Sequence, residues 1–253
     1  SGKGGVGKST LTSQLARIIA DDPEMQVGIL DVDICGPSQP RMMGVPDERM
    51  HASQSGLDPV VTGENGNISV VSVGFLLESE EQAVIWRGPK KNGLLKQFLR
   101  DVLWESLDFL LVDTPPGTSD EHLSLVQLLK PIDGAILVTT PQEISWQDVR
   151  KELDFCRKVN LPVIGIVENM AGFICEACGH KSSIFEEDGW SSGGASVVQK
   201  YAAENGIRYL GRVPLDPKVA MCLDSGLSLL THYPSSKAAE SLRHICKQLI
   251  SNE

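Results

Sequence analysis

The first ten residues constrain the fold of this chain more than any other stretch does. Residues 2–9 read G-x-x-x-x-G-K-S, the pattern of a loop that cradles the phosphates of a nucleoside triphosphate. Glycines let the backbone approach the phosphates closely, Lys8 can reach the terminal phosphates, and the Ser9 hydroxyl can ligate Mg²⁺. A chance match is disfavoured, because a helical pattern follows at once and a matching acidic strand end lies downstream. The residues expected to contact the nucleotide here are Gly2, Lys3, Gly4, Gly5, Val6, Gly7, Lys8, Ser9 and Thr10.

Length and composition are typical of an ordinary soluble protein. The chain has 253 residues, of which 41% are hydrophobic and 22% charged, enough for a single domain over residues 1–253. The net charge of −10 argues against a nucleic-acid partner, and the absence of a long apolar run argues against a membrane partner. Six cysteines are too few for a disulfide scaffold and favour a reducing compartment. A strand normally precedes a phosphate loop, so we expect that the first strand is missing before Ser1.

Helical and strand patterns alternate along the rest of the chain. This alternation predicts an α/β fold, a P-loop NTPase with a mostly parallel sheet, helices on both faces and the nucleotide at the carboxyl ends of the strands. Strands are expected at 27–33, 68–75, 108–113, 134–140, 162–168 and 207–213. Helices are expected at 8–20, about 94–102, 119–130, 145–159, 193–204, 216–225 and 235–251, with irregular segments at 44–66 and about 169–192.

Two apolar strands end in carboxylates that suit phosphate chemistry. Residues 109–117 have the shape of a Walker B strand and its switch loop, in which Asp113 would hold the Mg²⁺ shell and the Gly117 N–H would meet the γ-phosphate. Asp31 and Asp33 end the strand after the first helix, where such enzymes place the residue that orients the attacking water. We favour Asp33 for that role. The alternative is that both carboxylates only terminate the strand.

Cys175 and Cys178 form the C-x-x-C pair of the sequence. Two thiolates at this spacing can share a soft metal or a cluster, but a tetrahedral Zn²⁺ or a [4Fe–4S] cluster usually takes four ligands. A symmetric dimer would supply both cysteines twice, whereas His180 would bring a single-chain site only to three ligands. We favour a dimer-bridging iron–sulfur cluster over zinc, a dithiol redox pair or no special role. The remaining cysteines are expected to be small buried hydrophobic residues: Cys35, Cys156, Cys222 and Cys246.

Lys3 lies inside the phosphate loop, in the pattern K-G-G-x-G-K-S. In this feature the sequence resembles the NTPases with a deviant Walker A motif, which include MinD, ArsA and the nitrogenase iron protein. The resemblance implies that Lys3 reaches across a dimer interface to the nucleotide of the other chain and couples ATP binding to dimer closure. A solvated surface lysine is the alternative interpretation.

Further stretches resemble the Mrp-type branch of that family over nearly the whole chain. This branch contains the eukaryotic cytosolic iron–sulfur scaffolds called nucleotide-binding proteins one and two. Residues 31–38 look more like the first, whose N-terminal four-cysteine module this sequence lacks. The usual C-P-x-C of the branch has Glu176 in place of proline here, a change that removes no ligand. The stretches that carry the resemblance are 31–38, 85–92, 113–122 and 167–170, together with the C-x-x-C pair.

The resemblance implies an ATP-binding and weakly ATP-hydrolysing scaffold. It would work as a homodimer, or as a heterotetramer with a paralogue, and hold a labile [4Fe–4S] cluster between two C-x-x-C loops. It would pass the cluster to apo-proteins of the cytoplasm and the nucleus. Asn169 sits where the branch contacts the adenine base. Hydrolysis would use a water held by Asp33, with the phosphate charge stabilised by Lys8, by Mg²⁺ and by Lys3 of the other chain.

Two other functions stay open. A spatial regulator of the MinD type would bind membranes through a C-terminal amphipathic helix. Residues 238–250 place four apolar side chains on one face, but the charges among them are mixed, which favours packing on the domain instead. The four are Leu242, Ile245, Leu249 and Ile250. The second is a P-loop ATPase whose C-x-x-C pair forms a purely structural zinc knuckle.

Overall fold

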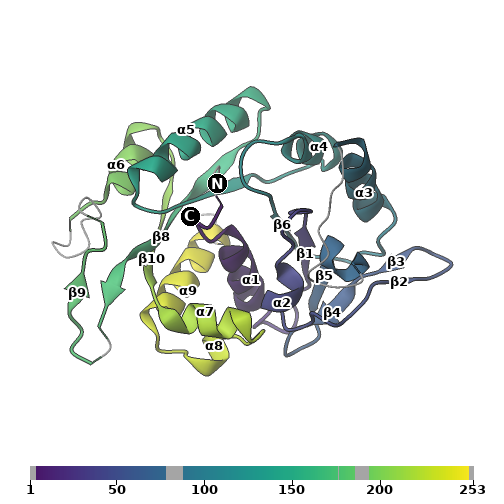
Figure 1. The fold of residues 1–253 in the computed structure, drawn as a ribbon, viewed down its shortest axis with the longest axis horizontal. Coiled ribbons are helices and arrows are strands. Elements are labelled where there is room, and N and C mark those ends of the chain that lie inside the picture. Colours follow the sequence, from purple (N-terminus) through teal and green to yellow (C-terminus); the bar gives the residue numbers. More distant parts are fainter. Residues whose placement is uncertain (1–3, 78–87, 176, 186–193, 251–253) are drawn as a thin grey trace.

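The described strands form two mostly parallel sheets and a short hairpin (Figure 1). The structure, a computed structural model, describes residues 4–77, 88–175, 177–185 and 194–250. One sheet has the order β4-β5-β1-β6, and the other has the order β10-β8-β7 with β9 added to β8. Only β4 and β9 run antiparallel to their neighbours within these described sheets. The strands are β1 (Val27–Asp31), β2 (His51–Ala52), β3 (Leu57–Asp58), β4 (Val60–Thr62), β5 (Ile68–Ser72), β6 (Phe109–Asp113), β7 (Ala135–Thr139), β8 (Val163–Ile174), β9 (Lys181–Ser182) and β10 (Tyr209–Leu215).

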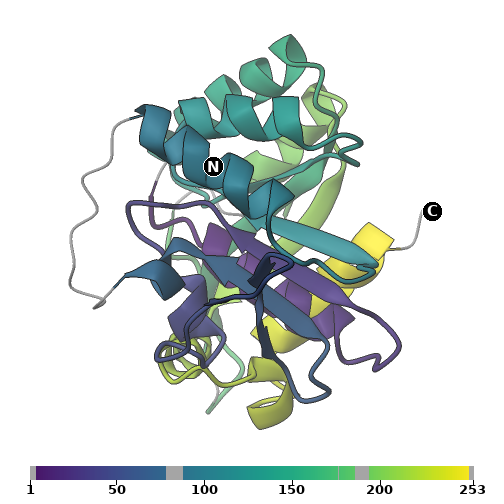
Figure 2. The same ribbon diagram turned by 90° about the vertical axis from the view of Figure 1, so that its right-hand side faces the viewer.

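Helices cover both faces of these sheets (Figure 2). A core on one face joins α1 and α9 to β1, β5, β8 and β10, and on the other face α5 and α6 cover β7 and β8 while α3 and α4 cover β1 and β5. The predicted α/β architecture is therefore confirmed. The helices are α1 (Lys8–Ile19), α2 (Gln39–Met42), the 3₁₀ turn η1 (Val73–Leu76), α3 (Gly88–Arg100), α4 (Asp120–Leu128), α5 (Glu143–Lys158), α6 (Val197–Glu204), α7 (Pro217–Asp224), α8 (Leu229–His232) and α9 (Lys237–Ile250).

The carboxyl ends of three neighbouring strands bring polar side chains together. β1 is buried along its whole length, as expected for a central parallel strand covered on both faces. In the register of the sheet its last residue, Asp31, lies opposite Ser72 of β5 and Asp113 of β6. Side chains from segments far apart in the sequence thus meet at one edge of the sheet.

Several predicted boundaries were wrong by a few residues. β1 ends at Asp31, not at residue 33, so Asp33 lies in the following loop. The predicted strand 68–75 ends at Ser72, because the next four residues turn into η1. The polar segment 44–66, predicted to be irregular, contains β2, β3 and β4. These short strands have little buried surface, so their sequences lack the apolar pattern by which a strand is recognised.

The largest correction concerns β8. The strand was predicted to end at residue 168 and to give way to a loop over about 169–192, yet it continues to Ile174. Its extension is held by β10, through the pairs Asn169–Val213 and Phe173–Leu215, and by β9. The C-x-x-C pair therefore lies in the turn between two paired strands.

The C-terminal helix packs on the domain, as its mixed charges favoured. Leu242 and Ile245 of α9 are fully buried in the core that α9 shares with α1 and β10. Along the described part of the chain, no helix combines the length and the apolar character that crossing a membrane requires.

A close backbone contact ties α2 to the turn after α7. Gly226 has φ +68°, and a Cβ at this position would overlap the Cα of Gly44. The Arg17 guanidinium donates to Met42 O at 3.2 Å and to Gly226 O at 2.9 Å, which fixes both loops against α1. The backbones can approach this closely only because both residues lack a side chain.

We therefore expect Gly226→Ala to lower the free energy of unfolding by about 3 kcal/mol or more, because left-handed strain adds to a steric overlap. Gly206→Ala is the matched control, since Gly206 has φ +65° with nothing near its Cβ position. It should cost only about 1–2 kcal/mol. Urea titration of both variants measures the difference, and equal losses would show that the contact with Gly44 is unimportant.

Candidate nucleotide site and cysteine hairpin

The phosphate loop leads directly into α1. Gly5 and Gly7 have φ of +81° and +93°, the left-handed conformation that favours glycine. Gly7 is the N-cap of α1, and its carbonyl accepts from the N–H of Leu11 at 2.9 Å. The N–H groups of the first turn have no carbonyl partners within the helix and are available to an anion. Of the predicted loop residues the structure describes Gly4 to Thr10, whereas Gly2 and Lys3 lie outside the described residues.

Asn169 lies against this loop. Its Nδ2 donates to Val6 O at 2.9 Å, and a Cβ on Gly7 would overlap that same amide group. The strand β8 therefore reaches the phosphate loop by way of Asn169. The next residue, Met170, has φ +56°, an uncommon conformation for a residue with a long side chain. The structure thus brings Asn169 to the loop, and its predicted contact with adenine remains a prediction.

Asp31 is the most enclosed carboxylate of the site. Sequence analysis had favoured Asp33 over it as the residue that orients the attacking water. Asp31 is fully buried and accepts four hydrogen bonds. The donors are the N–H groups of Asp33 (3.1 Å), Ser38 (3.1 Å) and Gln39 (3.2 Å) and the hydroxyl of Ser72 (3.0 Å). Burial and the charge of neighbouring Asp113 raise the pKa of Asp31 to about 8, and the hydrogen bonds from Gln39, Ser72 and Asp33 oppose that rise. Asp31 thereby holds the loop after β1 in place.

Asp113 has an oxygen that is open to a further ligand. Its Oδ2 accepts from Gln39 Nε2 at 2.9 Å, while its buried Oδ1 has no hydrogen-bond partner among the described residues. Burial raises the pKa of Asp113, and hydrogen bonding from the Ser9 hydroxyl and the charge of Lys8 lower it. The free oxygen, the Ser9 hydroxyl and the hard oxygen donors fit the predicted Mg²⁺ site.

Gln39 is a site residue that sequence analysis missed. Its Nε2 donates both to Asp113 and to Ser9 O, at 3.1 Å, and the whole residue is buried. It links the loop after β1, the phosphate loop and β6. Its place six residues after Asp33 was the one available signal, because an amide has no spacing rule comparable to that of the phosphate loop.

Asp33 stands apart from the buried pair, in the loop after β1. Its Oδ1 accepts from Gly36 N at 3.2 Å, and the side chain is only partly buried. Burial raises the pKa of Asp33, whereas the charges of Lys8 and Lys91 lower it. Asp33 is therefore both close to the phosphate-loop lysine and accessible to water, which a water-orienting carboxylate requires.

The loop after β6 ends in a capped helix. Gly117 has φ +84°, and two residues beyond it Ser119, the N-cap of α4, forms a capping box with His122. The Nδ1 of His122 accepts from Ser119 N at 3.3 Å, in the position that Glu or Gln usually takes. Burial lowers the pKa of His122 to about 4, and the charge of Lys8 contributes in the same direction.

His122 should make the protein less stable in acid. The unfolded imidazole takes up its proton near pH 6.5 and the folded one only near pH 4. Protonation between these values therefore favours the unfolded state, and stability is lost as pH falls through this window. We expect His122→Gln, which keeps the capping hydrogen bond, to lessen this loss by roughly 1–2 kcal/mol. Urea titrations at pH 7 and pH 5 measure it, and equal losses in both proteins would contradict this prediction.

The C-x-x-C pair lies at the tip of the β8–β9 hairpin. The turn is closed by Cys175 N donating to His180 O at 2.9 Å and Gly179 N donating to Cys175 O at 2.7 Å. Cys175 is partly exposed and Cys178 is exposed, and Glu176 lies outside the described residues. Within the described ranges no group of three or more His, Cys, Asp or Glu side chains could hold a metal ion. One chain thus presents two accessible thiols at the tip of a hydrogen-bonded hairpin.

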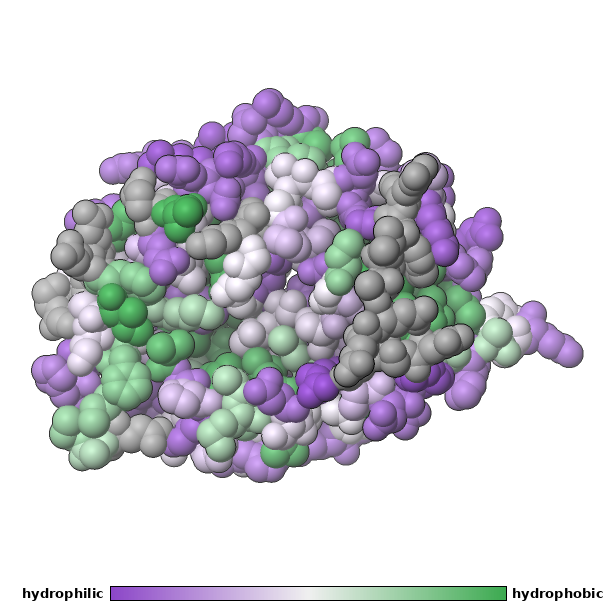
Figure 3. Space-filling view, in the orientation of Figure 1, coloured by the Kyte–Doolittle hydropathy of each residue, from purple (hydrophilic) through white to green (hydrophobic). Residues whose placement is uncertain are grey.

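Apolar side chains surround this hairpin. Phe173 of β8 and Leu215 of β10, which are paired in the sheet, are exposed by 36% and 43%, and Ile184, two residues beyond β9, is exposed by 43%. Figure 3 shows hydrophobic residues gathered over this side of the molecule.

The single cysteines Cys156, Cys222 and Cys246 are buried as predicted, but Cys35 was wrongly expected to be buried and is exposed.

Comparison with known proteins identifies the family. A family model described as the NUBPL iron-transfer P-loop NTPase, of the ParA group, matches residues 1–250. This chain belongs to that family. The resemblance to Mrp-type NTPases seen in the sequence is thereby confirmed, and nucleotide hydrolysis is the general activity of P-loop NTPases. Iron transfer is the property for which the family is described.

Solved structures agree with the assignment to the NUBPL family. A nucleotide-binding protein of Archaeoglobus fulgidus in complex with ADP, in which cobalt was found, is 35% identical over 94% of this chain and 90% of its own, with a TM-score of 0.74. MinD of Pyrococcus horikoshii, complexed with Mg-ADP, is 20% identical over 99% of this chain and 93% of its own, with a TM-score of 0.69. MinD in the MinC:MinD complex of Aquifex aeolicus is 17% identical over 100% and 94%, with a TM-score of 0.67. The MinD likenesses show the fold alone.

Proposed function

We propose that this chain is an ATP-hydrolysing scaffold that assembles a labile [4Fe–4S] cluster at a dimer interface and transfers it to apo-proteins of the cytoplasm and nucleus. The observation that carries the proposal is the pair of accessible thiols, Cys175 and Cys178, at the tip of a hairpin in an iron-transfer P-loop NTPase. Thiolates are the usual ligands of such clusters, and exposure is what release to an acceptor requires.

The nucleotide half of the mechanism rests on the phosphate loop and the strand ends. Lys8 and the first turn of α1 bind the phosphates of ATP, and Asn169 lies beside the loop to contact the adenine base. Asp33 orients the attacking water, and Gly117 offers its N–H to the γ-phosphate. Ser9 and Asp113 would hold Mg²⁺, which when bound neutralises charge on the phosphate oxygens. Gln39 keeps Ser9 and Asp113 together.

The cysteine half of the mechanism needs a second chain. Two thiols from each hairpin would give the four ligands that a [4Fe–4S] cluster takes, whether the dimer is made of two copies or includes a paralogue. The exposed Phe173, Ile184 and Leu215 beside the hairpin suit such an interface. We further propose that residues 1–253 form one domain and that Lys3 reaches the nucleotide of the opposite chain.

Two rival functions are less well supported. A MinD-like membrane regulator would need a free apolar face on the C-terminal helix, but Leu242 and Ile245 of α9 are buried in the core. A structural zinc knuckle would need four ligands from one chain, and the described residues near the hairpin offer fewer.

Purification without oxygen tests the proposal directly. We expect a broad iron–sulfur absorption and about four iron and four sulfide per two chains. Size-exclusion chromatography of the same sample, with and without ATP, should show the dimer. Zinc without iron or sulfide would overturn the scaffold proposal and favour the knuckle, while liposome co-sedimentation with ATP would favour the MinD-like alternative.

A further inference from the structure

Lys91, near the start of α3, connects two loops that flank the nucleotide site. Its Nζ lies 2.9 Å from Glu121 Oε1 of α4 and 3.3 Å from Cys35 Sγ in the loop after β1. Both ends of the ion pair are enclosed, since the side chains of Lys91 and Glu121 are only 21% and 9% exposed. Such a pair is more specific in geometry than an ion pair on the open surface.

The partners of Lys91 belong to the two loops that the proposed hydrolysis depends on. Cys35 is two residues from Asp33, in the segment that Asp31 fixes at its other end through Ser38 and Gln39. Glu121 is in the first turn of α4, directly after the loop of Asp113 and Gly117, and Ser119 hydrogen-bonds its carboxylate. Lys91 therefore bridges the loop of the water-orienting carboxylate and the loop expected at the γ-phosphate.

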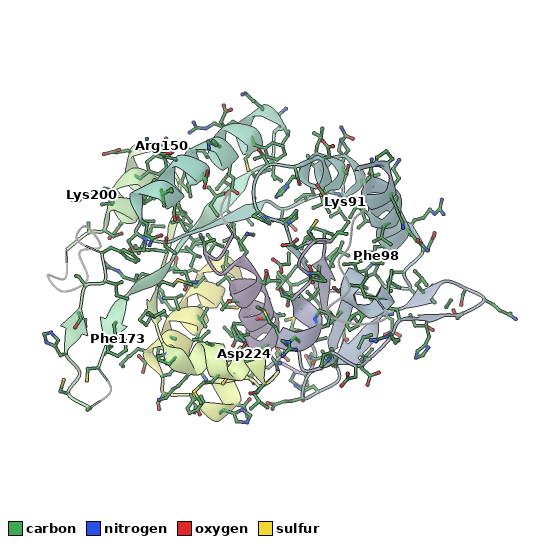
Figure 4. The ribbon with its side chains drawn as sticks, in the orientation of Figure 1. Lys91, Phe98, Arg150, Phe173, Lys200 and Asp224 are labelled. Atoms are coloured by element: carbon green, nitrogen blue, oxygen red, sulfur yellow. The ribbon has the colours of Figure 1, made fainter. Side chains whose placement is uncertain are left out.

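The contact of α3 with α4 makes this bridge rigid. Leu95 and Phe98 of α3 are buried in one apolar cluster with Leu125 of α4 and with the strands beneath (Figure 4 labels Lys91 and Phe98). The Lys91 ammonium is also close enough to Asp33 for its charge to lower the pKa of that carboxyl. A lysine held at a fixed point of a packed helix can restrain a loop that otherwise has few buried side chains.

We propose that Lys91 is a positioning residue for ATP hydrolysis: it holds residues 33–36 against the start of α4, and so sets the rate of hydrolysis without setting nucleotide affinity. The proposal rests on the proposed ATPase activity. It assigns no contact between Lys91 and the substrate. Its effect is on the placement of Asp33, where a small displacement of an attacking group slows a reaction strongly.

The test compares Lys91→Met with Lys96→Met, which removes an exposed lysine from the same helix. We expect Lys91→Met to lower kcat for ATP about tenfold, with the Kd for MgADP changed less than about twofold, and Lys96→Met to change neither. Lys91→Arg keeps the charge and should recover much of the rate. The double variant Lys91→Met/Glu121→Gln should be no slower than Lys91→Met alone, because the two residues act through one contact.

Amide hydrogen exchange gives a second readout that does not depend on catalysis. Residues 33–36 should exchange faster in Lys91→Met than in the wild type, with no change in Lys96→Met. An unchanged kcat with unchanged exchange would overturn the proposal, and so would a loss of MgADP affinity as large as the loss of rate. If the wild type hydrolyses no ATP, the proposed ATPase activity fails, and the exchange experiment still decides whether Lys91 restrains the loop.

Discussion

Replacing Asp33 by alanine is expected to slow ATP hydrolysis by about 100-fold or more, the usual effect of losing a group that orients or activates the attacking water. Binding of MgADP should change less than about twofold. The reason is the location of Asp33 in the loop after β1, where it is partly open to water and feels the charge of Lys8, while the phosphate contacts come from other residues. Phosphate release under single-turnover conditions and a binding titration measure the two effects separately.

Asp47→Ala is the control for this prediction, because Asp47 is an exposed carboxylate outside the strand ends. Asp47→Ala should leave the rate of ATP hydrolysis and the binding of MgADP unchanged. If Asp33→Ala instead hydrolyses ATP at the wild-type rate, Asp33 does not orient the water, and Asp31 becomes the carboxylate to test.

Replacing Cys178 by serine is expected to remove nearly all iron and sulfide from the anaerobically purified protein. In a symmetric dimer the single change deletes two of the four thiolates that a cluster needs, and serine is a poor substitute ligand for iron in this setting. Iron and sulfide assays together with the visible absorption spectrum measure the loss. Folding should be unaffected, because Cys178 is exposed and the turn is closed by backbone hydrogen bonds.

Cys35→Ser is the matched control, since Cys35 is also an exposed thiol but lies beside the nucleotide site. It should retain full iron content. Equal iron in Cys178→Ser and the wild type would mean that the hairpin does not bind the cluster.

The sequence predicted the elements with strong local signals. The phosphate loop, the acidic strand ends and the alternation of apolar strands with amphipathic helices depend on residues close together in the chain, and all three reappear in the structure. The contact between Asn169 and Val6 was less accessible, because it joins residues far apart in sequence. Only the family resemblance indicated that Asn169 lies at the nucleotide site.

Features that depend on long-range pairing were missed. Residues 169–174 contain asparagine and glycine and were interpreted as a loop, but hydrogen bonds from β10 and β9 hold them in a strand. Gln39 and Lys91 were missed for the same reason, because their hydrogen bonds are made with residues far away in the sequence. Cys35 was misjudged because nothing in a single sequence distinguishes an exposed thiol from a buried one.

The course of β8 from the phosphate loop to the hairpin gives the nucleotide site and the thiols a direct structural connection. Asn169 at the phosphate loop and Cys175 at the hairpin tip are joined by β8, whose pairing with β10 shifts register between Asn169 and Phe173, so that about 3.3 Å per residue gives an upper limit of roughly 20 Å for their separation. A small rotation of β8 about Met170, the left-handed residue beside Asn169, would therefore be magnified at the thiols and would couple the two sites mechanically.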